Sequence, residues 1–172
     1  MVLVQLAIDK EGQFVGTTKN TPVSIHHTMR DLWKELADDG LITQEEFKKT
    51  TFVSYFRTVD EFKKPFEFQD SPVLKAGLSL VSIETKVIDC PYRKKWLKNG
   101  GDPKAHAQWY IPAVRTWSNA TFTSGLSDSR SPEEKENIVD ELFKRYEHEV
   151  VKRPEDHGAC HVLAYMVIAK KY

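Results

Sequence analysis

The sequence has few cysteines, no excess of charge of either sign and no long hydrophobic run. Lys and Arg number 25, and Asp and Glu also number 25, so the formal net charge is +0. Nucleic-acid binding usually needs a surplus of positive charge facing the phosphates, so this balance argues against a nucleic-acid partner. No run of about 18 apolar residues occurs, so we expect no transmembrane helix and no membrane partner.

The two cysteines are Cys90 and Cys160. Two unpaired thiols in a reducing cytosol are the favoured interpretation, and a single disulfide remains the alternative. The apolar start of the chain lacks a preceding basic region and runs directly into Asp9 and Lys10, so no signal peptide is predicted. These features together predict a cytoplasmic protein.

Familiar cofactor and nucleophile motifs are missing. The sequence contains no G-x-G-x-x-G, P-loop, G-x-S-x-G or H-E-x-x-H pattern. The segment from His157 to His161 places two imidazoles and the thiol of Cys160 close together. A zinc site needs a further ligand at a matching spacing, and no second Cys/His pair offers one. We therefore predict no cofactor-binding residues and no metal ligands.

Three segments read as strands. Val2–Ile8 and Val162–Ala169 are almost continuously apolar, which predicts strands buried on both faces. Val81–Val87 alternates apolar and polar residues, which predicts a strand with one more exposed face. Two doubly buried strands need neighbouring strands and helices over both faces, so we expect further elements to precede Met1.

Several segments carry helix signals. Ser24 is placed to cap the start of a helix that ends at Gly40. Capping boxes at Thr43, Thr58 and Ser131 predict the starts of three further helices. A further helix is expected over Lys104–Phe122, with these residues on one face: Trp109, Ala113, Thr116, Trp117 and Ala120. The fold class predicted is therefore α/β, with about three strands and five to seven helices.

Several segments, taken in order, resemble a known family. They are Met1–Leu6, Ile25–His27 running into Leu32–Ile42, Ser54–Phe62, Val114–Trp117, Glu141–Tyr146 and Tyr165–Lys171. Their order and spacing resemble the SABATH carboxyl methyltransferases, in which an "MVL" strand leads to a cap helix ending in "GLI". Glu141–Tyr146 is similar to that family's "LFERY", and Ser54–Phe62 is similar to its "FYAPSPEEF". The resemblance spans nearly the whole chain.

The resemblance implies an organisation for the chain. Residues 1–172 would form a single C-terminal segment of a class I, Rossmann-like methyltransferase domain with an α-helical cap. Within it, residues 1–22 would supply a sheet strand and loop, residues 23–77 the helical cap, and residues 78–172 the remaining strands and helices. The half that binds S-adenosylmethionine would lie upstream of Met1 and is absent from this sequence.

The function implied is methyl transfer from S-adenosylmethionine to the carboxylate of a small organic acid. Such a carboxylate has a pKa near about 4, so it is ionised at neutral pH and needs no general base. We expect the chain alone to be inactive. We also expect a homodimer if its apolar strand edges associate. The alternative is a non-catalytic small-molecule binding or regulatory module derived from such an enzyme.

The resemblance also carries over candidate substrate-binding residues, and it assigns no catalytic residue. These residues are Ile25, His26, Tyr55, Val114, Trp117 and His161. His26 and Trp117 stand where the family usually has Trp and Val, which implies a differently shaped and more polar acceptor site. The metal-binding segment of plant members corresponds to residues 48–51, which lack its Asp and Asn, so no metal is carried over. Composition leaves open whether any one aromatic residue is core or lines a cavity.

Overall fold

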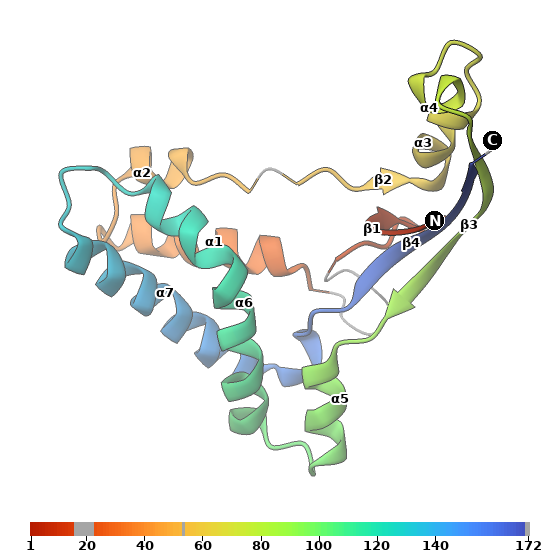
Figure 1. The fold of residues 1–172 in the computed structure, drawn as a ribbon. Helices are drawn as coiled ribbons and strands as arrows, with labels where there is room; N and C mark the ends of the chain where they lie inside the picture. Colours follow the sequence, from red (N-terminus) through yellow and green to blue (C-terminus); the bar gives the residue numbers. More distant parts are fainter. Residues whose placement is uncertain (16–22, 53, 171–172) are drawn as a thin grey trace.

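A computed structural model describes residues 1–15, 23–52 and 54–170. In this part of the chain it shows a mixed α/β fold with a four-stranded curled sheet, seven α-helices and two short 3₁₀ helices (Figure 1). The loop expected up to residue 22 is described only as far as Val15, and Lys171 at the end of the expected last strand also lies outside the described residues.

The four strands lie in the order β2-β1-β4-β3. They are β1 (Val2–Ile8), β2 (Arg57–Thr58), β3 (Leu78–Ile88) and β4 (His161–Lys170). β4 is antiparallel to both β1 and β3, so β1 and β3 run in the same direction, and β2 pairs in parallel with the end of β1. The carboxyl ends of β1 and β3 therefore lie at the same side of the sheet, which is where ligands bind in open α/β sheets.

The expected burial of the two apolar strands on both faces is wrong for the described chain. β4 buries every second residue, namely Val162, Ala164, Met166 and Ile168. β1 is largely exposed, with Val2 at 62% and Val4 at 47%, because the elements that pack here cover only its end around Ala7. Continuous hydrophobicity indicates what a strand can bury, but the surrounding elements decide which residues are covered.

The helices begin and end close to the positions that their capping residues predict. They are α1 (Ile25–Asp38), α2 (Gln44–Lys49), α3 (Val59–Lys63), η1 (Lys64–Phe66), α4 (Pro72–Lys75), α5 (Pro91–Lys98), α6 (Pro103–Gly125), α7 (Pro132–Lys152) and η2 (Pro154–Asp156). All three expected capping boxes are confirmed, at Thr43, Thr58 and Ser131. Capping is encoded locally, which is why the sequence locates these boundaries well.

Two hydrophobic clusters organise the molecule. The larger one joins α1, α6 and α7, and the rings of Trp33 and Phe122 meet there with centroids 4.9 Å apart. The smaller one lies between the sheet and α3, around Phe62. Residues 23–77, the expected helical cap, contribute to both clusters: α1 joins the larger one, whereas α3 packs at β2 and β3. Figure 1 shows this division, with α1 and α2 beside α6 and α7 and with α3 and α4 near the sheet.

The residues expected to share one face of the long central helix are not the ones that α6 buries. α6 directs Tyr110, Val114, Ser118 and Phe122 into the larger cluster, whereas Trp117 is 47% exposed. The sequence pattern was misleading because α6 is apolar on more than one side, so a single stripe is not defined. Trp117 consequently lies on a side of α6 that is free to contact something other than the core.

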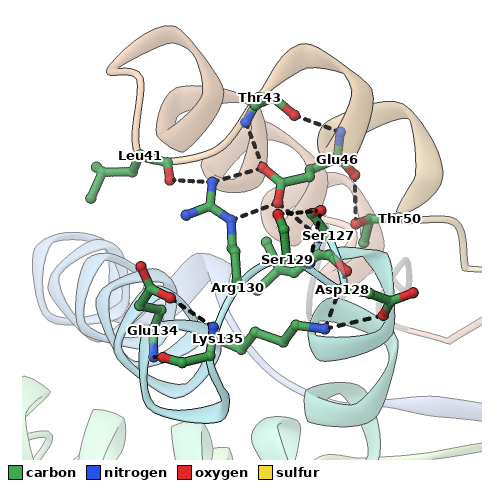
Figure 2. A network of polar contacts seen from close by, with 12 residues as sticks. Leu41, Thr43, Glu46, Thr50, Ser127, Asp128, Ser129, Arg130, Glu134 and Lys135 are labelled. Atoms are coloured by element: carbon green, nitrogen blue, oxygen red, sulfur yellow. Dashed lines mark hydrogen bonds and ion pairs between the residues drawn. The ribbon is translucent and has the colours of Figure 1, made fainter.

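α2 is tied to the connection between α6 and α7 by a polar network around Glu46 (Figure 2). The Glu46 carboxylate is 3% exposed as a residue and accepts two hydrogen bonds from Arg130, at 2.6 and 2.8 Å. Backbone N–H groups of Thr43 and Ser127 also donate to it. The arrangement satisfies both carboxylate oxygens, as a buried charge requires.

Gly125, the last residue of α6, lies close to Thr50, the residue that follows α2. A Cβ added there would lie 1.9 Å from Oγ1 and 3.1 Å from Cα of Thr50. We predict that Gly125→Ala lowers the free energy of unfolding by about 1–3 kcal/mol, since overpacking outweighs the gain in helix propensity. Urea denaturation measures this, with the exposed neighbour Ser124→Ala as the control. Equal stability of the two variants would contradict the close approach.

No helix within residues 1–15, 23–52 and 54–170 is both long enough and apolar enough to cross a membrane.

Candidate functional site

A cavity of about 610 Å³ lies where the larger cluster meets the carboxyl ends of β1 and β3. β1 contributes Leu6 and the end of β3 contributes Ile88, while the first turn of α1 supplies Ile25 and His26. The middle of α6 supplies Tyr110, Ala113, Val114 and Trp117. Its volume is within the range of small-molecule sites, and its walls are mainly apolar and aromatic.

Five of the six residues carried over as candidate substrate contacts line this cavity: Ile25, His26, Val114, Trp117 and His161. They come from α1, α6 and the start of β4, so the fold brings together positions spread over most of the sequence. Tyr55 does not line it. Its side chain is 71% exposed, and its hydroxyl hydrogen-bonds to the carboxylate of Glu61.

The base of the cavity is made by buried aliphatic side chains. Ser24 caps α1 by accepting a hydrogen bond from the His27 N–H, which fixes the first turn of that helix. This turn directs Ile25 inward, where it is 2% exposed beside Val114 of α6 in the same cluster. His26 is half-buried and His27 is exposed, because successive side chains of a helix point in different directions.

Aromatic rings form one wall. The His26 ring lies 5.7 Å from Phe52, 6.4 Å from Phe56 and 5.8 Å from Trp117, centroid to centroid. Edge-on and tilted contacts between aromatic rings at such distances are energetically favourable. The Trp117 ring therefore packs against His26 and Phe52 at the cavity wall. Trp117 is not a core residue.

The cavity is close to electrically neutral. Burial lowers the pKa of His161, and burial together with the neighbouring His27 lowers the pKa of His26, so both imidazoles are largely uncharged at pH 7. Nδ1 of His161 is buried without a hydrogen-bond partner in the described residues. The described lining holds no Lys or Arg, and the Asp89 carboxylate lies 3.0 Å from Nζ of Lys94.

Sequence reasoning missed several lining residues. Asp89, Pro91 and Tyr92 follow β3 directly, and Phe56 precedes β2. The position of the first three, just after the carboxyl end of a strand, was the one available signal, because loops at that edge line ligand sites. Ala113 and Leu6 carry no such signal, since small and aliphatic residues serve equally in cores.

A second hollow of about 570 Å³ lies between α1, α6 and α7. It is an open, charged groove in which Arg145 already pairs with Asp39 at 2.7 Å and with Glu141 at 3.0 Å. Such partly exposed ion pairs in an open groove form a solvated surface and not an enclosed site. Among the described residues, no group of three or more His, Cys, Asp or Glu side chains is arranged to hold a metal ion.

In comparisons with known proteins, no family model and no curated protein sequence matches this chain.

Proposed function

We propose that this chain forms the acceptor-binding part of an S-adenosylmethionine-dependent methyltransferase that methylates the carboxylate of a small organic acid. One observation carries the proposal. Five residues that the SABATH resemblance assigns to acceptor contact line a single cavity of about 610 Å³, although they span residues 25 to 161. A chance alignment of loose motifs gives no reason for such convergence.

The sheet is compatible with this role. Its cavity lies at the carboxyl ends of two strands that run in the same direction, the usual ligand position in an open α/β sheet. Along Val2–Leu6, no strand of the described chain pairs with the outer edge of β1. This open edge supports a larger class I methyltransferase sheet in which further strands pair there.

The turn after β1 does not fit the cofactor. Its backbone N–H groups at Glu11 and Gln13 donate to the Asp9 carboxylate, at 3.0 and 2.8 Å, so they are not available to an anionic or ribose group. We therefore propose that S-adenosylmethionine, which would supply the methyl group, is not held by the N–H groups of Glu11 and Gln13. The proposed role of this chain is to bind and orient the acid.

Orientation is the main catalytic demand of this reaction. A carboxylate is already ionised at pH 7, so no general base is required, and correct placement of reacting atoms is worth roughly 7–11 kcal/mol. The apolar walls remove water from the acid. The neutral imidazoles of His26 and His161 supply hydrogen-bonding groups without a fixed cation that would hold the carboxylate as an ion pair.

Trp117→Val is predicted to change which acids are accepted while leaving the fold intact. Removing the ring enlarges the cavity, so bulkier acids should gain relative to smaller ones by about 10–200-fold in affinity, the usual effect of one apolar contact. Because Trp117 is 47% exposed, the melting temperature of the Trp117→Val variant should be only slightly below that of the wild type. The measurement is a titration of wild type and variant with a panel of carboxylic acids, alongside thermal melting.

An unchanged ranking of acids with a large fall in melting temperature would mean that Trp117 is structural and the cavity is not the acceptor site. Methyl transfer to a bound acid by a protein that joins this chain to a cofactor-binding segment tests the enzyme directly. Acid binding without transfer in such a protein would favour the alternative, a non-catalytic binding module.

A further inference from the structure

The two cysteines lie beside each other although they are 70 positions apart in the sequence. Cys90 is the N-cap of α5 just after β3, and Cys160 directly precedes β4. The paired strands hold them together, since Ile88 is opposite His161 in the ladder. Both are only 1% exposed and both are free thiols.

Their contacts show how close the side chains are. The backbone N–H of Cys90 donates to Sγ of Cys160 at 3.3 Å. Sγ of Cys90 accepts the N–H of Arg93 at 3.4 Å in the first turn of α5. One sulfur therefore touches the backbone of the other cysteine, so the two residues are direct neighbours, as an intramolecular disulfide requires.

A separate small cavity gives access to the pair. It has a volume of about 210 Å³ and is lined by both cysteines together with Arg93, Lys94 and Leu97. Nε of Arg93 is buried there without a hydrogen-bond partner in the described residues. A small polar oxidant such as a peroxide fits this volume and would find a cationic donor next to the thiols.

We propose that Cys90 and Cys160 form a reversible modification site, at which a peroxide oxidises them to an intramolecular disulfide. In the first step one sulfur attacks a peroxide oxygen, the O–O bond breaks, and a sulfenic acid and one water form. The second sulfur then attacks the sulfenic sulfur, the S–S bond forms, and a second water leaves. The two thiols lose two electrons and two protons, and the peroxide takes up both.

Formation of the disulfide should alter the cavity of about 610 Å³, because the residues on either side of both cysteines line it. They are Asp89, Pro91, Ala159 and His161. A bond between the two sulfurs changes the spacing of these two short segments, and with it the shape of the cavity rim. Oxidation is therefore expected to weaken acid binding. This second part rests on the proposed function, whereas formation of the disulfide does not.

The first arm of the test uses the purified wild-type chain treated with a small excess of hydrogen peroxide. The expected result is a monomer that has lost two hydrogen atoms by intact mass, with both thiols blocked and full reversal by dithiothreitol. Because the sequence has only these two cysteines, an intramolecular disulfide has one assignment. Thiols that stay free, or that gain oxygen atoms without a cross-link, would overturn the proposal.

Cys90→Ser and Cys160→Ser are the matched controls, and neither should form the intramolecular bond. Serine also serves as an N-cap, so Cys90→Ser keeps the start of α5. The second arm compares acid affinity of oxidised and reduced wild type, where we expect a roughly tenfold loss on oxidation, the effect of one apolar contact. Equal affinities would overturn the coupling, and no acid binding by the reduced chain would instead refute the proposed function.

Discussion

Glu46→Ala is expected to lower the free energy of unfolding by about 3–5 kcal/mol, the usual effect of removing one partner from a buried ion pair. The change leaves the guanidinium of Arg130, whose side chain is 23% exposed, without its carboxylate. It also leaves the N–H groups of Thr43 and Ser127 without their acceptor (Figure 2). Urea denaturation measures the loss, with the exposed neighbour Glu45→Ala as the matched control.

The charge on Glu46 makes the same junction sensitive to strong acid. The guanidinium of Arg130, helped by the backbone N–H groups, holds the pKa of this carboxyl well below its usual 4.5. Stability from this pair is therefore complete above the unfolded pKa of 4.5 and is lost as the pH falls below it. If Glu46→Ala and Glu45→Ala were equally stable, the network would not be what joins α2 to the α6–α7 connection.

Lowering the pH from 7 to 4 is expected to cost about 3 kcal/mol of stability through one buried histidine. Burial, aided by Arg153, lowers the pKa of His157 from 6.5 to about 4. Below pH 6.5 the unfolded chain gains a proton that the folded chain does not bind, so stability falls with acidification until the pH reaches about 4. The pKa of His106 is also lowered by burial, which adds in the same direction.

Geometry explains why His157 resists protonation. Its ring is 2% exposed, packs 5.6 Å from the ring of Tyr146, and has Nε2 buried without a partner in the described residues. His106 Nε2 hydrogen-bonds to the backbone oxygen of His157 at 3.1 Å, which keeps the two residues together. A charge on the His157 ring would be desolvated with little compensation.

Denaturation between pH 6.5 and 5 isolates the histidine effect, because most carboxylates stay ionised over that range. His157→Leu should make the fall in stability with acidification less steep, and the remaining dependence should come from groups such as His106. His148→Gln, on the exposed side of α7, is the control and should keep the wild-type slope. A wild-type stability that does not fall over this range would contradict the buried, uncharged state of His157.

The sequence predicts those features of the fold that local chemistry decides. Ser24, Thr43 and Ser131 cap helices where expected because a side-chain oxygen and the nearby N–H groups are sufficient. The exposure of β1 and the orientation of α6 were not predictable, since each depends on which distant elements pack against it. The strand β2 has only two residues, too few to carry any periodicity, so the expected count of about three strands fell short of four.

The candidate site was predictable only through resemblance. No periodicity relates His26 to His161, yet both line the cavity because α1 and β4 each begin at the same side of the sheet. Tyr55 shows the limit of such transfer: it lies one residue before the lining residue Phe56, and consecutive residues of an extended chain point in opposite directions. A shift of one position in a loose motif match is enough to select Tyr55 in place of the lining residue Phe56.

We propose that the cavity binds a small organic acid, and filling the cavity tests this most directly. Ala113→Phe places a ring into the cavity from α6, whereas Ala120→Phe places the same ring on an exposed position of the same helix. Titration with small carboxylic acids, followed by calorimetry, should show binding to wild type and Ala120→Phe and at least a tenfold loss in Ala113→Phe. Equal binding by all three folded proteins, or none by wild type, would contradict the account.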